Sequence, residues 1–78
     1  MLSPRQIEIL SMIASGLEKE QIAYFLGISL HTVDEHTRRA FLKLGACTSA
    51  QAVYLAITSG VPLVSYNLSV TQIRNSTN

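Results

Sequence analysis

Hydrophobic residues recur every three or four positions over most of the first 60 residues, which is the spacing of helices that each bury one face. Glycines and capping residues divide this pattern into four segments. We therefore predict four helices, near residues 4 to 15, 19 to 26, 30 to 44 and 49 to 59. The expected fold class is all-α, a small four-helix domain with an irregular C-terminal tail.

Two of these helices begin with a capping-box signature, in which a hydroxyl residue and a glutamine three positions later cap each other's backbone N–H groups. Ser3 and Gln6 form the first pair, with Pro4 in the first turn, and Thr48 and Gln51 form the second. These starts are local signals and do not depend on tertiary contacts.

The segment from Ile22 to Leu44 follows the plan of a helix-turn-helix motif, a short helix and a longer one joined by a tight turn. Gly27 can adopt the positive φ that ends the first helix, and Ser29 is a good N-cap for the second. Ile28 between them supplies an apolar plug beside the turn.

The buried faces follow from helical wheels. For the longer helix the buried side contains Val33 with Leu30, Thr37, Ala40, Phe41 and Leu44, and we expect Val33 and Leu44 to be its anchors. The first helix buries Ile9, Leu10, Ile13 and Leu17, with Leu2 before it, and leaves Ile7 and Met12 partly exposed. The last helix buries Ala52, Val53, Ala56 and Ile57.

At these residues the sequence resembles the LuxR-type (GerE-like) DNA-binding domain of bacterial transcription regulators. The matching pieces are Leu2-Ser3-Pro4-Arg5, Ile9-Leu10, Ala14, Gly16, Ile22-Ala23, Leu26-Gly27-Ile28-Ser29, Thr32-Val33, His36, Lys43-Leu44-Gly45 and Ala52-Val53. This ordered set at fixed spacing is more specific than a lone helix-turn-helix pattern. The resemblance implies a four-helix fold whose third helix enters the major groove.

Candidate DNA contacts lie on the outward side of that third helix. Arg38 is the best base reader because a guanidinium can contact guanine through two hydrogen bonds, and the resemblance also brings Asp34 and Glu35 toward base edges. The residues placed to hold phosphates are Lys19, Thr32, Arg39 and Lys43. The resemblance further implies a dimer contact on the last helix, where Tyr54, Leu55 and Thr58 face away from the core.

The sequence departs from the family pattern at four positions. Glu20 and Asp34 stand where members often carry basic residues, so DNA binding should be weaker, although an acid in the groove can accept from the cytosine amino group. Tyr24 and Phe25 stand where polar residues are usual. They either mark a protein contact or lie flat over a small core, and we prefer the second interpretation.

Composition narrows the function classes. The 78 residues are 47% hydrophobic and 14% charged, which fits one compact domain, but a net charge of +1 is weak for a nucleic-acid binder. The single cysteine, Cys47, cannot form an internal disulfide, and the sequence has neither a leader nor a long apolar run, so we expect a cytoplasmic protein without membrane contact. No metal-ligand or nucleophile–base spacing is present, hence neither a cofactor nor enzymatic activity is expected.

After Gly60 the family match ends. Pro62 breaks helical continuation, and Val64, Tyr66, Leu68 and Val70 then alternate with polar residues. We expect residues 1–60 to form the helix-turn-helix domain and residues 61–78 to be an arm-like or disordered extension.

Two functions follow. The leading one is a sequence-specific transcription regulator that binds an inverted repeat in double-stranded DNA as a homodimer. The alternative is a helix-turn-helix module that acts by protein contact, with a full-length regulator or RNA polymerase as candidate partners, and binds little DNA itself. Low charge and the Tyr24-Phe25 pair favour the alternative, whereas the intact turn and Arg38 favour the first.

Overall fold

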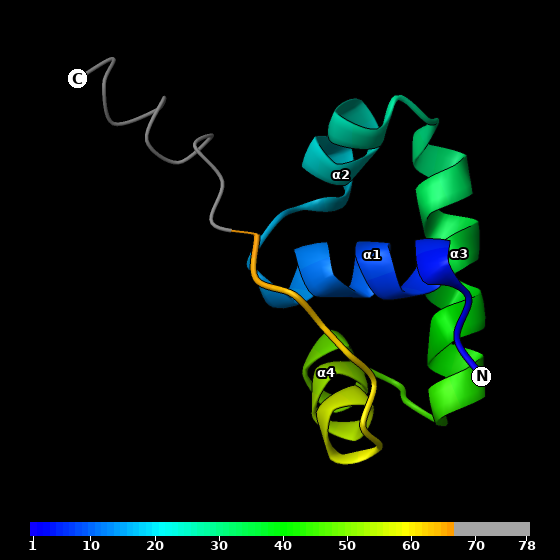
Figure 1. Cartoon of the computed structure of the whole chain (residues 1–78). Coiled ribbons are helices and arrows are strands. Elements are labelled where there is room, and N and C mark those ends of the chain that lie inside the picture. The colour runs from blue at the N-terminus through cyan, green and yellow to red at the C-terminus, as the bar shows by residue number, and fades with distance from the viewer. Residues whose placement is uncertain (67–78) are drawn as a thin grey trace.

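The computed structural model describes residues 1–66. They form α1 (Pro4–Ala14), α2 (Lys19–Leu26), α3 (Leu30–Leu44) and α4 (Ser49–Thr58), and this part of the chain contains no strand. In Figure 1, α1 lies in the middle of the molecule with α2 and α4 on either side, and α3 runs past its N-terminal end. The predicted all-α fold is confirmed.

The helix starts agree with the local signals, with one exception. At α1 the Ser3 hydroxyl accepts from the Gln6 N–H at 3.1 Å and Gln6 Oε1 accepts from the Ser3 N–H at 2.9 Å, so this capping box is complete. At α4 the Thr48 hydroxyl accepts from the Gln51 N–H at 3.1 Å, but Gln51 Oε1 accepts from Cys47 instead, at 2.7 Å. The second predicted box is therefore only half formed.

Helix α1 lies between α2 and α4 at the centre of the core and, like α3, contacts all three other helices. It buries Ile9 and Leu10 as expected, but also Met12, which is 1% exposed. The prediction that Met12 is partly exposed is wrong, since a helix surrounded by three others buries more than one stripe. Ile7, also off the predicted stripe, is half-buried.

The core has two clusters, one on each side of α1. One is centred on α1 and α4 and contains Leu2, Leu10, Ala40, Ala52 and Ala56. The other joins α1 to the helix-turn-helix and contains Ile9, Met12, Ile22, Ala23 and Val33. The helix-turn-helix is therefore held by its own apolar cluster.

Several predicted core residues lie nearer the surface than expected, and Ile13, Leu17, Phe41 and Val53 are half-buried. Leu30 is 42% exposed because it is the first residue of α3, at the edge of the packed region, and Leu44 in the last turn of the same helix is only half-buried. Ile57 is 60% exposed. Helix α4 approaches the core through two alanines, Ala52 and Ala56, and so buries a narrower stripe than its wheel predicted.

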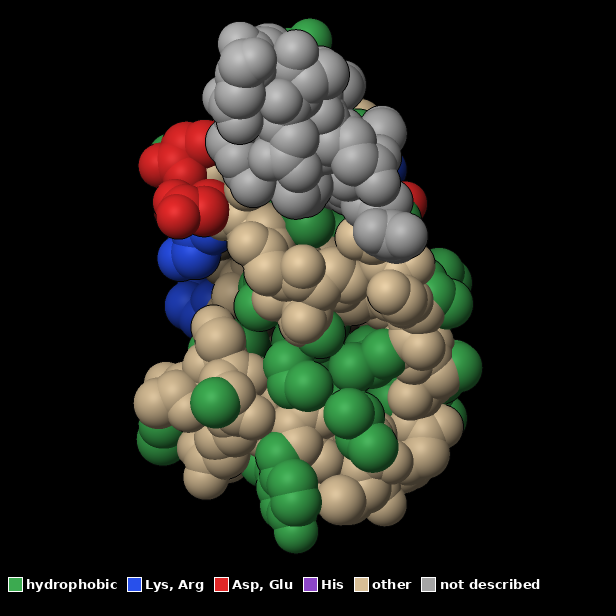
Figure 2. Space-filling view, turned by 90° about the vertical axis from the view of Figure 1, so that its left-hand side faces the viewer, with side chains coloured by type: hydrophobic (Ala, Val, Ile, Leu, Met, Phe, Trp, Pro, Cys, Tyr) green, Lys and Arg blue, Asp and Glu red, His purple; other side chains and the backbone are tan. Residues whose placement is uncertain are grey.

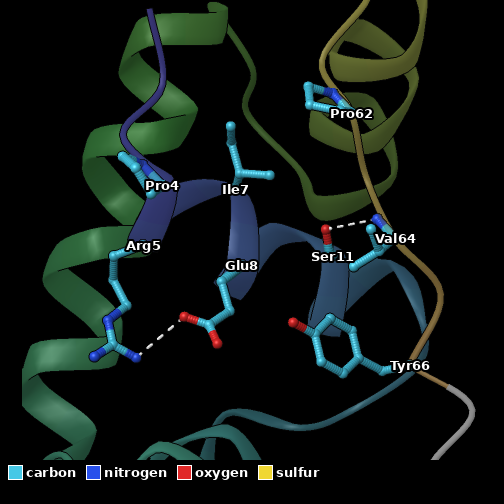
Figure 3. Close-up of a pocket in the computed structure, with 8 residues that line it drawn as sticks. All are labelled: Pro4, Arg5, Ile7, Glu8, Ser11, Pro62, Val64 and Tyr66. Atoms are coloured by element: carbon cyan, nitrogen blue, oxygen red, sulfur yellow. Dashed lines mark hydrogen bonds and ion pairs between the residues drawn. The ribbon is translucent and has the colours of Figure 1, made fainter.

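Residues 61–66 run back along α1 without regular secondary structure (Figure 1). The N–H groups of Val64 and Tyr66 donate to the hydroxyls of Ser11 and Ser15, at 3.1 and 2.8 Å; Figure 3 shows the first of these contacts. Ser11 and Ser15 are four residues apart on a helix, a rise of ~6 Å, and Val64 and Tyr66 are two residues apart in an extended segment, a span of ~6.6 Å. The spacing of the two serine hydroxyls therefore fits the spacing of the two N–H groups that donate to them. Figure 2 shows hydrophobic side chains gathered across this face.

The remaining predicted features of the tail, including the alternation at Leu68 and Val70, lie outside the described residues. Within residues 1–66, each helix by itself is too short or too polar to cross a membrane. Helices α3 and α4 satisfy length and composition only as a pair bent by 54°.

Candidate nucleic-acid interface

The turn between α2 and α3 has the geometry of a helix-turn-helix. Gly27 adopts φ +69°, the left-handed conformation that glycine tolerates best, and the Ile28 N–H donates to the Ala23 carbonyl at 3.0 Å. The Ser29 hydroxyl then accepts from the Thr32 N–H at 3.0 Å and caps α3. These local bonds fix the angle at which α3 leaves the turn.

One side of α3 is seated on the core by small and β-branched residues. Val33 is completely buried, Ala40 is 2% exposed, and the buried Thr37 hydroxyl donates to the Val33 carbonyl at 2.8 Å. The side chains of Arg38 and Arg39 are 60% and 65% exposed. The predicted arginines therefore lie on the accessible side of the helix.

Glu35 lies among the basic groups of that side. Its Oε1 accepts a 2.8 Å hydrogen bond from Arg38 Nη2 and lies 3.7 Å from Arg39 Nε. Its Oε2 lies 3.9 Å from Nε2 of His31, whose side chain is 82% exposed. His31 lies on the outward side of α3, as its wheel position predicts, but was assigned no contact, although its i,i+4 spacing from Glu35 indicates this pairing.

The same contacts keep Glu35 ionised. The hydrogen bond from Arg38 and the charge of Arg38 hold the pKa of Glu35 below its usual range. Desolvation opposes them, and the charges of Arg39 and His31 act in the same direction as Arg38. The carboxylate is therefore an acceptor for these donors at neutral pH.

A second acid–base pair joins α2 to α3. Lys19 Nζ lies 2.9 Å from Asp34 Oδ1, and both side chains are about half exposed, at 52% and 48%. The candidate phosphate contact at Lys19 and the candidate base contact at Asp34 are thus brought together and partly neutralise each other.

The other two candidate phosphate contacts also have partners within the chain. The Thr32 hydroxyl lies 2.8 Å from the Ser29 hydroxyl. Lys43 Nζ donates to the Met1 carbonyl at 3.1 Å and to Gln6 Oε1 at 3.2 Å, which ties the end of α3 to the start of α1. A phosphate would have to replace or share these contacts, so the polar groups of this surface are less available to DNA than the helical wheel of α3 predicts.

On α4, the candidate dimer residues are only partly brought together. Tyr54 is 65% exposed and Thr58 is exposed, and they lie on one face, whereas Leu55 is half-buried. Ile57 was predicted to be core but joins Tyr54 on the exposed side. The Thr58 hydroxyl donates to the Tyr54 carbonyl at 3.0 Å and so is not free of local contacts.

The two unusual aromatics of α2 are not folded over the core. Tyr24 is 88% exposed and Phe25 is 48% exposed. The preferred interpretation that both lie flat over the core is therefore wrong, because both are exposed and neither belongs to the cluster that Ile22 and Ala23 help to form or to the other core cluster. Within residues 1–66, no three His, Cys, Asp or Glu side chains are grouped closely enough to hold a metal ion.

Comparison with known proteins gives a consistent result. The model of a family described as bacterial regulatory proteins, luxR family, matches residues 1–56. The chain is 35% identical over 60 residues to the transcriptional regulatory protein YdfI of Bacillus subtilis, which covers 77% of this chain and 28% of that protein. The same identity and coverage relate it to the transcriptional regulatory protein FixJ of Azorhizobium caulinodans.

A third relative, the uncharacterized transcriptional regulatory protein YxjL of Bacillus subtilis, is 40% identical over 57 residues, which cover 73% of this chain and 26% of that protein. The chain thus spans little more than a quarter of the length of these curated relatives. No solved structure gives a significant match to this chain.

Proposed function

The chain belongs to the luxR family of bacterial regulatory proteins, and from this premise we propose that it is a sequence-specific DNA-binding transcription regulator rather than an enzyme. Helix α3 enters the major groove, Arg38 contacts a base edge, and Arg39 contacts the phosphate backbone. The observation that carries the proposal is the seating of α3, which buries Val33 and leaves both arginines more than half exposed.

The backbone contacts of the proposed complex come from Lys19, Thr32, Arg39 and Lys43, with the N-terminal amides of α3 directed to the same strand. Asp34 and Glu35 approach the base edges as well; Asp34 can accept from cytosine there, whereas Oε1 of Glu35 already accepts from Arg38. Because Lys19 and Arg38 already have acidic partners, we expect modest affinity and a shallow dependence on salt.

The protein binds as a homodimer through α4, where Tyr54, Leu55 and Thr58 are the proposed contacts. The exposed Ile57 beside Tyr54 adds apolar area to this face. A two-fold dimer places two copies of α3 on successive turns of the duplex, so the proposed operator is an inverted repeat.

Selection from a pool of random duplexes, followed by a salt titration on the enriched sequence, tests the proposal. We expect an inverted repeat to be enriched and log K to fall linearly with log salt concentration. The matched control is the double variant Arg38→Ala/Arg39→Ala, which changes only exposed side chains and should keep the fold but lose the selection. A wild-type protein that enriches no sequence at low salt would contradict the proposal.

A second candidate function is protein contact, in which the chain pairs with a full-length regulator and lowers its DNA binding. The exposure of Tyr24, 88%, favours it, because large exposed aromatics are common anchors of protein interfaces. This function is expected if the wild type binds no DNA while it inhibits such a regulator, and if Tyr24→Ser removes the inhibition.

A further inference from the structure

We infer that Glu35 is a positioning residue for base recognition, which acts by holding the Arg38 guanidinium in place to contact a base. This inference rests on the proposed function of α3 and deepens it. The observation behind it is the 2.8 Å hydrogen bond from Arg38 Nη2 to Glu35 Oε1 on the exposed side of the helix.

The geometry leaves Arg38 able to read a base while it is held. A guanidinium carries five N–H donors in one plane, so a single contact with Glu35 leaves a complete pair of parallel donors for the O6 and N7 atoms of guanine. The Arg38 side chain is 60% exposed and that of Glu35 is 35% exposed. The arginine is therefore the more accessible of the two side chains.

Glu35 itself is poorly placed to read a base. Its Oε1 already faces both Arg38 and Arg39, and its Oε2 faces His31 at 3.9 Å. At Oε1, a direct contact with cytosine would compete with the charge-assisted hydrogen bond from Arg38, which is stronger than a neutral one, so such a contact would fall to Oε2. The contacts of Oε1 favour a role toward the two neighbouring arginines.

Holding Arg38 in advance should favour binding. A free arginine loses rotamer freedom when it contacts DNA, whereas a side chain already ordered by a neighbour loses less. The carboxylate also lies between two arginines, so it limits their nonspecific attraction to phosphates. Both effects raise discrimination at the base that Arg38 contacts relative to affinity for random DNA.

The test compares the base preferences of the wild type, Arg38→Ala, Glu35→Ala and the double variant in one duplex selection. Arg38→Ala should reduce discrimination at one base pair of the half-site by about tenfold or more. Glu35→Ala should reduce discrimination at that same base pair, by about threefold or more, and the double variant should be no worse than Arg38→Ala alone. If Glu35 only stabilised the fold, Glu35→Ala would not reduce discrimination at one base pair in particular.

Glu8→Ala is the matched control. It removes a carboxylate from a similar i,i+3 pair, with Arg5 at 3.2 Å on α1 (Figure 3), and should leave every base preference unchanged. The inference is overturned if Glu35→Ala reduces discrimination at a different base pair, which would make Glu35 a direct reader, or if it reduces discrimination at none. A wild type without any preferred sequence would overturn the proposed function as well, so the two failures are distinguishable.

Discussion

The Lys19 ammonium lies 2.9 Å from the Asp34 carboxylate and so joins the first residue of α2 to the outward side of α3. Half-exposed ion pairs of this kind contribute little to stability. Their effect on DNA binding should be larger, because in the proposed complex the pair engages a lysine that would otherwise contact phosphate and places a carboxylate in the groove.

We expect Asp34→Asn to increase affinity for DNA of any sequence and to steepen the salt dependence by about one phosphate contact per protomer. The substitution releases Lys19 and removes one repulsive charge. A salt titration by fluorescence anisotropy measures both effects. In a Lys19→Ala background most of the steepening should disappear, and a steepening of equal size there would mean that the pair does not restrain Lys19.

Arg39→Ala should lower the affinity for cognate and for random DNA equally, because a phosphate contact carries no sequence information. The slope of log K against log salt should fall by about one contact per protomer. Lys43→Ala should have the same character with a smaller effect, since Lys43 Nζ already donates to Met1 and Gln6. A loss confined to the cognate sequence would assign either residue to base reading instead.

Leucines at two depths of the core should respond differently to truncation. Leu10 is 1% exposed, so Leu10→Ala should cost ~2–5 kcal/mol of unfolding free energy, a large share for a domain of this size. Leu44 is only half-buried, and Leu44→Ala should cost clearly less. Urea denaturation followed by circular dichroism compares them, and equal costs would contradict the burial difference.

Local signals account for the features that could be predicted from sequence. The Ser3 capping box, the turn at Gly27 and the Ser29 cap depend on neighbours within a few residues, and all three form. The exposure of Arg38 and the burial of Val33 also follow from one helical period.

Features that depend on how helices pack were not predictable in this way. A wheel assumes one buried stripe, which fails for Met12 because α1 is surrounded and for Ile57 because α4 packs through alanines. The Lys19–Asp34 pair joins two helices and depends on their crossing. The contacts of Glu35 lie within α3 and are a different case, because its i,i+3 spacing from Arg38 and its i,i+4 spacings from Arg39 and His31 were all readable from the sequence.

The contact between residues 61–66 and α1 should be weakened by Ser15→Ala. The Ser15 hydroxyl accepts from the Tyr66 N–H at 2.8 Å, and the loss of one such hydrogen bond typically costs about 1 kcal/mol. Faster amide hydrogen exchange at Tyr66, measured by NMR, is the expected result. Ser65→Ala, at an exposed position of the same segment, is the control and should leave this exchange rate unchanged.

The titration of Glu35 should depend on Arg38. The folded-state pKa of Glu35 is lowered, first by the Arg38 hydrogen bond, so the pairing is fully present above the ordinary glutamate pKa and is lost as the pH falls through the lowered value. Arg38→Ala removes the largest cause and should move the pKa of Glu35 back up toward its usual range. Carbon-detected NMR of the Glu35 carboxyl measures both midpoints.

Arg5→Ala, which removes the partner of Glu8 on α1, should leave the Glu35 midpoint unchanged. Identical midpoints in the wild type and Arg38→Ala would mean that the Arg38–Glu35 hydrogen bond is not populated in solution, and the positioning role of Glu35 would lose its physical basis.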